Sequence, residues 1–259
     1  MSSFLSHRRK AFRGAFAPTD IAGLDLWLDA SDSSTLFDAT TGGSTPSDNG
    51  SVARWEDKST NANHATQGTS SLQPLRRVSE VNGLDAIDFI SSDVLEGAVA
   101  ITPRQTDAKT VFILLESDTT TAGVTPVNLY SYGVTPVLGK PALITVEVAY
   151  RAAGRTWVSS SPVSTTGASL ITMTHDGQTN IEDSLSFWLD GASVTKTSGV
   201  DGALVDDTAN YHVGRQASST SGGDYDGRLC EIIVYDTELS TADREAVETY
   251  LADKWGITI

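Results

Sequence analysis

The sequence GRLCEIIVYDTELSTADREAVETYLADKWG, residues 227–256, predicts a strand followed directly by a helix. Residues 227–235 form a mostly apolar run of the length and composition typical of a strand. Ser240 then begins a capping-box pattern and Gly256 follows the last helical residue, so we expect a helix over residues 240–255. Its apolar residues recur every three or four positions and form one stripe that would lie on the sheet: Ala246, Val247, Tyr250, Leu251 and Trp255.

Upstream of this segment, short apolar and β-branched runs alternate with turn signals, and no helix-like pattern lies between them. Asp190-Gly191 separates two of the runs, which is a strong short-range signal for a β-hairpin. Short strands at this spacing argue for an all-β sandwich or barrel and against βαβ units. The runs cover residues 24–28, 83–90, 109–116, 127–132, 142–150, 155–159, 169–175, 184–189, 192–197 and 211–215.

The charge of the chain is unevenly distributed. Residues 1–16 carry four cations and no acidic residue, whereas the rest has 14 basic against 33 acidic residues, a net charge of −19. Because so acidic a body repels phosphate groups, we expect no nucleic-acid binding. No stretch approaches the roughly 20 apolar residues that a membrane span needs. Cys230 is the only cysteine, which excludes an intramolecular disulfide and a cysteine-based zinc site, and we expect it to be a buried, inert thiol.

Residues 1–19 read as a basic arm ahead of a single domain, residues 20–259. Two interpretations of the arm stay open: a disordered tail, or an anchor that docks on an acidic partner surface. Charges stand where the apolar core of a secretory signal would be, so we expect no signal peptide and synthesis in the cytoplasm. The candidate anchoring residues are Arg8, Arg9, Lys10 and Arg13.

Four segments together resemble the concanavalin A-like lectin/glucanase superfamily, in its laminin-G-like and pentraxin-like branch. They are LDLWLDASDSSTL (24–36), VARWEDKSTNANHATQ (52–67), SFWLDGASV (186–194) and GRLCEIIVYDTELSTADREAVETYLADKWGI (227–257). The resemblance implies a two-sheet antiparallel jelly-roll sandwich that binds glycans or protein ligands, often with calcium at one rim. Such domains also occur in bacteriophage particles, and SHRRKAFRG (6–14) resembles the start of virion-associated proteins.

No catalytic apparatus is visible, and we expect no enzyme activity. Members of the superfamily that cleave glucans carry two carboxylates on one face of a strand, where they can straddle the glycosidic bond. The nearest acids here are Glu231, Asp236 and Glu238. Glu231 and Asp236 are five positions apart, so on a regular strand they face opposite sides. A Gly-x-Ser-x-Gly nucleophile motif is also absent.

Oxygen-bearing side chains at alternate positions make Asp57, Asn61 and Asn63 candidate calcium ligands. An EF-hand is excluded, because Ala62 stands where that loop needs glycine and Gly68 where it needs its bidentate glutamate. The alternative is that the three residues form turns through side-chain-to-backbone hydrogen bonds.

Two aromatic residues beside polar loops are candidate ligand contacts, Trp157 next to Arg155 and Tyr225 between Asp224 and Asp226. The alternative for both is packing in the core.

Together these features predict a non-catalytic binding or structural module, namely a phage virion accessory protein of the capsid-decoration or fibre type. Its arm would bind other virion proteins, its lectin-like domain would present a surface to host glycans, and a homo-oligomer is compatible with the sequence. The alternative is a cell-associated carbohydrate-binding lectin without a viral role.

Overall fold

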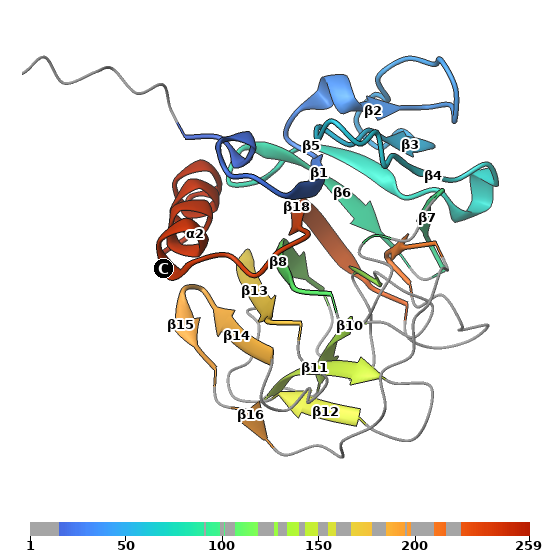
Figure 1. The fold of residues 1–259 in the computed structure, drawn as a ribbon. Coiled ribbons are helices and arrows are strands. Elements are labelled where there is room, and N and C mark those ends of the chain that lie inside the picture. Colours follow the sequence, from blue (N-terminus) through green and yellow to red (C-terminus); the bar gives the residue numbers. More distant parts are fainter. Residues whose placement is uncertain are drawn as a thin grey trace, which may run out of the picture.

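The computed structural model describes residues 16–90, 92–98, 101, 107–118, 127–128, 134–139, 143–149, 155–158, 167–177, 185–194, 196–197, 210–215 and 224–259. For residues 128, 134–139, 143–149, 155–158 and 196–197 that description covers the backbone alone. The described strands form an antiparallel sandwich, and α2 (Thr241–Trp255) lies on its outer side (Figure 1). This confirms the predicted all-β sandwich with one C-terminal helix.

The larger sheet has eight strands, with β18 (Gly227–Tyr235) near its centre. β18 pairs with β8 on one side. On its other side, its first three residues pair with β6 and its later residues with β1. The order is β15 (Ala192–Ser193), β14 (Leu185–Leu189), β13 (Ser169–His175), β8 (Lys109–Ser117), β18, β6 (Leu84–Phe89) and β5 (Leu75–Val81), with β1 (Leu24–Asp29) beside β18.

The second sheet has six short strands and faces the first, and a further four-stranded sheet follows in the middle of the chain. The six strands are β2 (Leu36–Phe37), β3 (Arg54–Trp55), β4 (Ala65–Thr66), β7 (Leu95–Gly97), β17 (His212–Val213) and β9 (Val127–Asn128). The four are β10 (Val134–Gly139), β11 (Leu143–Ala149), β12 (Arg155–Val158) and β16 (Lys196–Thr197). Short 3₁₀ helices cover Pro18–Asp20, Ser33–Thr35 and Ser70–Leu72.

The eight-stranded sheet is buried on both faces, which explains why β18 is mostly apolar. An inner core lies between the two larger sheets and takes Leu229, Ile232 and Val234 from β18. An outer core lies between the eight-stranded sheet and α2 and takes Cys230, Ile233 and Tyr235. Cys230 is the predicted buried thiol, and its burial raises the pKa of that thiol well above the ordinary value.

The local signals in the sequence correspond to observed helix caps and turns. The Ser240 hydroxyl accepts a hydrogen bond from the Asp243 backbone N–H at 3.2 Å, and Gly256 ends α2 with a φ of 68°. Asp190 and Gly191, with φ values of 48° and 72°, form the predicted hairpin turn between β14 and β15. Among the described residues, no helix has the length and apolar character needed to cross a bilayer.

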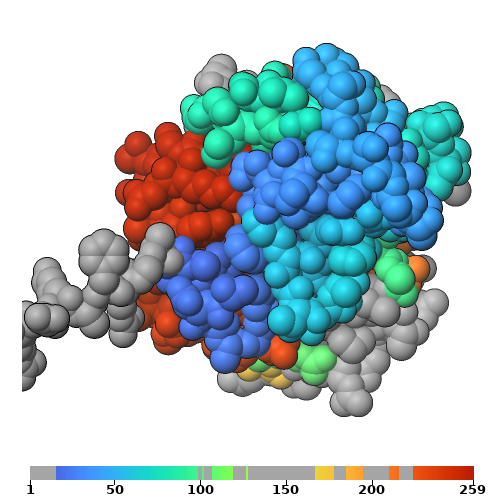
Figure 2. Space-filling model, turned by 90° about the horizontal axis from the view of Figure 1, so that it is seen from above, coloured from blue at the N-terminus to red at the C-terminus, as the bar shows by residue number. Residues whose placement is uncertain are grey.

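The segment just before β1 packs on α2 and on the outer core. The Phe16 ring centroid lies 6.0 Å from that of Tyr250, and the Pro18 carbonyl accepts a hydrogen bond from the Tyr235 hydroxyl at 2.8 Å. Figure 2 shows this N-terminal segment side by side with the C-terminal part of the chain on one face of the molecule. The predicted anchoring residues Arg8, Arg9, Lys10 and Arg13 lie outside the described residues.

A close backbone approach in the six-stranded sheet gives a test of this packing. A Cβ atom added to Gly97 would lie 1.8 Å from the fully buried Tyr211 ring. We therefore expect Gly97→Ala to lower the free energy of unfolding by about 2 to 3 kcal/mol, measured by urea denaturation. Gly68 is the matched control, because nothing lies within 4 Å of its added Cβ. Equal stability of the two variants would contradict the packing described here.

Candidate functional site

An irregularity in β18 determines where the buried carboxylate of Glu231 points. The register with β8 shifts between Leu229 and Glu231, so Cys230 is the extra residue of a β-bulge. On a regular strand, Glu231 would share the inner face with Leu229. Because of the bulge, both Cys230 and Glu231 lie on the outer side, toward α2.

Four donors surround the fully buried Glu231 carboxylate. Its Oε1 accepts hydrogen bonds from Trp27 Nε1 at 2.7 Å and from the Tyr250 hydroxyl at 2.9 Å. Its Oε2 accepts from Trp255 Nε1 and Lys254 Nζ, each at 2.7 Å. These four bonds use the accepting capacity of an ionised carboxylate.

The ammonium group of Lys254 connects Glu231 to a second buried carboxylate. Lys254 Nζ lies 2.7 Å from Asp29 Oδ1, and Lys58 Nζ lies 2.8 Å from Asp29 Oδ2. Lys58 also pairs with Asp32 at 2.9 Å. Opposite charges thus alternate along Glu231, Lys254, Asp29, Lys58 and Asp32, which we call the ionic chain.

Burial and pairing act in opposite directions on the acids of the ionic chain. Burial, with the nearby negative charge of Asp29, raises the pKa of Glu231, and the Lys254 ammonium offsets only part of that rise. Burial also opposes ionisation of Asp29, but Lys254 and Lys58 hold its pKa below the ordinary value. A fully paired, buried cluster of this kind joins α2 to the sheet.

The other acids near Glu231 in sequence do not join it. Asp236 is exposed, and its Oδ1 lies beside Gly23. Glu238 is exposed and accepts a hydrogen bond from the Thr174 hydroxyl at 3.3 Å. The structure therefore brings Glu231 together with Asp29, an acid that sequence spacing could not connect to it.

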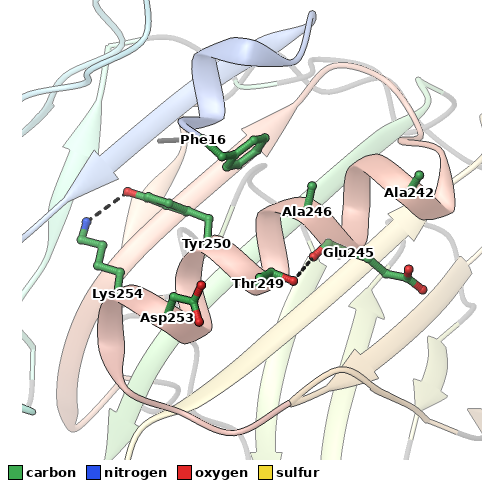
Figure 3. A pocket seen from close by; sticks show the side chains of 8 residues that line it. All are labelled: Phe16, Ala242, Glu245, Ala246, Thr249, Tyr250, Asp253 and Lys254. Carbon is green, nitrogen blue, oxygen red and sulfur yellow. Dashed lines mark hydrogen bonds between the residues drawn. The ribbon is translucent and has the colours of Figure 1, made fainter. Parts of the chain in front are cut away.

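A groove of about 640 Å³ lies on the outer side of α2, above the ionic chain (Figure 3). We call it the outer groove. Phe16 closes one side, and residues from successive turns of α2 form the rest. Its lining comprises Phe16, Ala242, Glu245, Ala246, Thr249, Tyr250, Asp253 and Lys254.

The outer groove combines half-buried aromatic rings with exposed oxygen atoms. The Tyr250 ring packs against Phe16 and, edge-on at 6.5 Å, against Trp27. The hydroxyl of Thr249 donates to the Glu245 backbone carbonyl at 2.8 Å, which leaves its lone pairs free to accept. Glu245 and Asp253 are exposed, so their carboxylates face solvent. Such a surface can bind a small polar molecule that has one apolar side.

The structure places Tyr225 in the inner core. The side chain is fully buried, and its hydroxyl lies 2.9 Å from the Glu116 carbonyl, to which it donates. Tyr225 therefore packs in the core, as the alternative interpretation expects, and its ring has no face open to a ligand. Trp157 lies in β12, where only the backbone is described, so its role as a ligand contact stays a prediction.

The three candidate calcium ligands lie together in one loop beside β1. Each carboxylate oxygen of Asp57 accepts two hydrogen bonds. Three of the four donors are the backbone N–H groups of Trp27, Ser59 and Asn63, and the fourth is the Ser59 hydroxyl. The side-chain amides of Asn61 and Asn63 donate to the Asp25 carbonyl at 3.1 and 3.0 Å. The bonds that Asp57 accepts within the loop are the side-chain-to-backbone turns of the alternative interpretation, whereas the two asparagine amides join the loop to β1. A calcium ion would have to displace the donors that already occupy Asp57.

Sequence reasoning did not identify Lys109 as an unusual residue. It is 2% exposed at the start of β8, opposite His175 on β13. Burial lowers the pKa of Lys109 to about 7, and burial together with Lys109 lowers that of His175 to about 4. The sequence signal that could have identified Lys109 is its position as a charged residue at the start of an apolar strand. Among the described residues, no cluster of His, Cys, Asp and Glu has the arrangement of a metal site.

Comparisons with known proteins show similarity of fold. No protein-family model and no curated protein sequence matches the chain. Domain 4 of a GH43 extracellular arabinanase from Geobacillus stearothermophilus, in complex with arabinotriose, is 10% identical with a TM-score of 0.51; the match covers 85% of this chain and 95% of that one.

Two longer proteins contain a similar sandwich. Trypanosoma rangeli sialidase in complex with sialic acid matches at 14% identity and a TM-score of 0.52, over 92% of this chain and 34% of the sialidase. The binding domain of botulinum neurotoxin DC in complex with rat synaptotagmin II matches at 8% identity and a TM-score of 0.54. That match covers 91% of this chain and 55% of the other chain. This chain therefore spans about a third of the sialidase. The shared feature is the sandwich fold, and two of these three structures hold a carbohydrate.

The ionic chain predicts a large effect of removing its central cation. Lys254→Met leaves two buried carboxylates without their shared partner, so we expect the free energy of unfolding at pH 7 to fall by about 3 to 5 kcal/mol. Without the ammonium group, the pKa values of Glu231 and Asp29 rise in the folded state. As the pH falls, the folded variant then binds protons before the unfolded chain does, which stabilises the folded state. The loss of unfolding free energy relative to the wild-type chain should therefore be smaller at pH 5 than at pH 7. Urea denaturation at both pH values measures this, and a loss independent of pH would indicate lost packing alone.

Proposed function

We propose that this chain is a non-catalytic carbohydrate-binding module. The observation that carries the proposal is the match to the arabinotriose-bound domain, which extends over most of both chains. The outer groove supports it, because aromatic rings beside carboxylate and hydroxyl oxygens can contact both the apolar face and the hydroxyl groups of a sugar. The strongly acidic body and the described helix, which does not span a membrane, are compatible with this role.

The buried position of the acids supports the absence of catalysis. Glycoside hydrolysis needs two carboxyl groups that flank the glycosidic bond, one of which donates a proton. Glu231 and Asp29 are one pair of acids that the fold brings together, but both are buried and are bridged by Lys254. A sugar cannot enter between them while α2 is in place.

We further propose that the module belongs to a bacteriophage virion, as a capsid-decoration or fibre-type accessory protein. The support is the sequence itself: the segment SHRRKAFRG (6–14) and the contrast between the basic residues 1–16 and the acidic remainder. In this proposal the arm binds other virion proteins and the sandwich presents its surface to host glycans. A cell-associated lectin would use the same sandwich without the viral attachment.

Glycan binding can be tested with the purified full chain on immobilised oligosaccharides, including arabinotriose, lactose and 3′-sialyllactose. We expect saturable binding to at least one glycan and no release of reducing sugar on prolonged incubation. The heat-unfolded chain is the control for non-specific retention. Retention of none of the glycans would refute carbohydrate binding, and sugar release would refute the non-catalytic role.

Attachment through the arm can be tested by deleting residues 2–15, which leaves the contact of Phe16 with Tyr250 in place. If the arm anchors the protein, the shortened chain should fold but be absent from purified particles, as detected by mass spectrometry. Circular dichroism of the purified chain checks the fold. Incorporation equal to that of the full chain would contradict the anchoring role of the arm.

A further inference from the structure

We propose that the outer groove is the glycan-binding site and that it selects uncharged glycans over sialylated ones. This inference rests on the proposed carbohydrate-binding function and names its site and substrate class. It follows from three features: a preorganised aromatic surface, exposed oxygen acceptors, and a lysine whose donors are all in use.

The aromatic surface is held rigid by the layer beneath it. The Tyr250 hydroxyl donates to the buried Glu231 carboxylate at 2.9 Å, and the Tyr250 ring packs edge-on against Trp27. Phe16 then lies at 58° to Tyr250 and bounds the groove (Figure 3). Because these contacts restrict the Tyr250 rotamer before any ligand arrives, binding on this ring costs little side-chain entropy.

The helix provides space and acceptors next to these rings. Ala242 and Ala246 have small side chains, which leave space for a ligand between Phe16 and α2. The groove volume of about 640 Å³ lies within the range of small-molecule sites. Glu245 and Asp253 stand about two turns apart on α2 as exposed carboxylates. Sugar hydroxyls would donate to them in charge-assisted hydrogen bonds.

The only cation lining the groove, among the described residues, is Lys254. Its Nζ lies 2.7 Å from Asp29, 2.7 Å from Glu231 and 3.2 Å from the Tyr250 hydroxyl. An ammonium group has three donors, so these contacts leave none for a ligand. Among the described residues, a sialic acid carboxylate would therefore find no free cation in the groove, and it would be repelled by Glu245 and Asp253. An uncharged sugar meets no such repulsion.

The first experiment measures specificity with a matched pair of ligands. Lactose and 3′-sialyllactose differ by one sialic acid, and arabinotriose adds a second neutral probe. In titration calorimetry with the full chain, we expect a neutral probe to bind at least about fivefold more tightly than 3′-sialyllactose. The difference should shrink at high salt, because the repelling carboxylates are exposed. Tighter binding of 3′-sialyllactose would overturn the proposed selectivity.

Variants of the groove then locate the site. Ala246→Trp fills the groove between Phe16 and the helix and should weaken the neutral probe at least about tenfold. Glu245→Lys with Asp253→Lys replaces the repelling charges and should tighten 3′-sialyllactose binding several-fold. Glu96→Lys is the control, because Glu96 is 43% exposed on β7, in the opposite sheet, and should change neither affinity. Thermal melting confirms that each variant is folded.

The outcomes separate this inference from the function on which it rests. If a neutral glycan binds but Ala246→Trp and the double charge reversal leave both affinities unchanged, the glycan site lies elsewhere and the inference fails while the proposed function stands. If no glycan binds the wild-type chain, both fail. If the groove retains a basic peptide with residues 2–15 of this sequence and no neutral glycan, the site is a protein-docking surface and the inference is wrong.

Discussion

The rest of the fold depends on the burial of one carboxylate, that of Glu231. An ionised acid in a protein interior is tolerated only when its charge is paired and its oxygens accept hydrogen bonds. Here the donors come from β1, through Trp27, and from the last two turns of α2, through Tyr250, Lys254 and Trp255. These bonds hold the last two turns of α2 against β18 and β1, above the outer core.

This constraint gives a physical meaning to the segments that resemble the lectin superfamily. Trp27 and Asp29 lie in the first segment, Lys58 in the second, and Glu231 in the last, so three stretches far apart in sequence meet in the ionic chain. The remaining segment contributes Trp188, over which the Arg244 guanidinium of α2 stacks at 4.2 Å. These residues of the four segments therefore hold α2 on the sheet.

The same arrangement connects the interior to the surface. Tyr250 contacts Glu231 through its hydroxyl and forms part of the outer groove with its ring. Lys254 likewise lines the groove, while its ammonium group is held by the two buried acids. The buried charges thus orient the aromatic surface of the groove and occupy Lys254, its one cation among the described residues.

Local sequence signals predicted local structure well, because caps and turns depend on residues a few positions apart. Ser240 and Gly256 delimit α2, and Asp190-Gly191 forms the hairpin turn between β14 and β15. The mostly apolar run at 227–235 is a strand. The role of the polar candidates could not be assigned from the sequence, because the same side chains that bind calcium also form turns. Asp57 is an example, since its neighbours' N–H groups already occupy its carboxylate. Tyr225 shows the same limit for aromatic residues, whose flanking sequence does not reveal on which side the ring is buried.

The sequence by itself therefore determined the fold class, the C-terminal helix with its caps, and the uneven distribution of charge. Only the tertiary structure decided the direction of Glu231, its partnership with Asp29 and Lys254, and the existence of the outer groove. The reason is that alternation along a strand assumes regular pairing, and the bulge at Cys230 in the pairing of β18 with β8 breaks this rule. The meeting of Phe16 with Tyr250 likewise depends on how the chain closes over more than two hundred intervening residues.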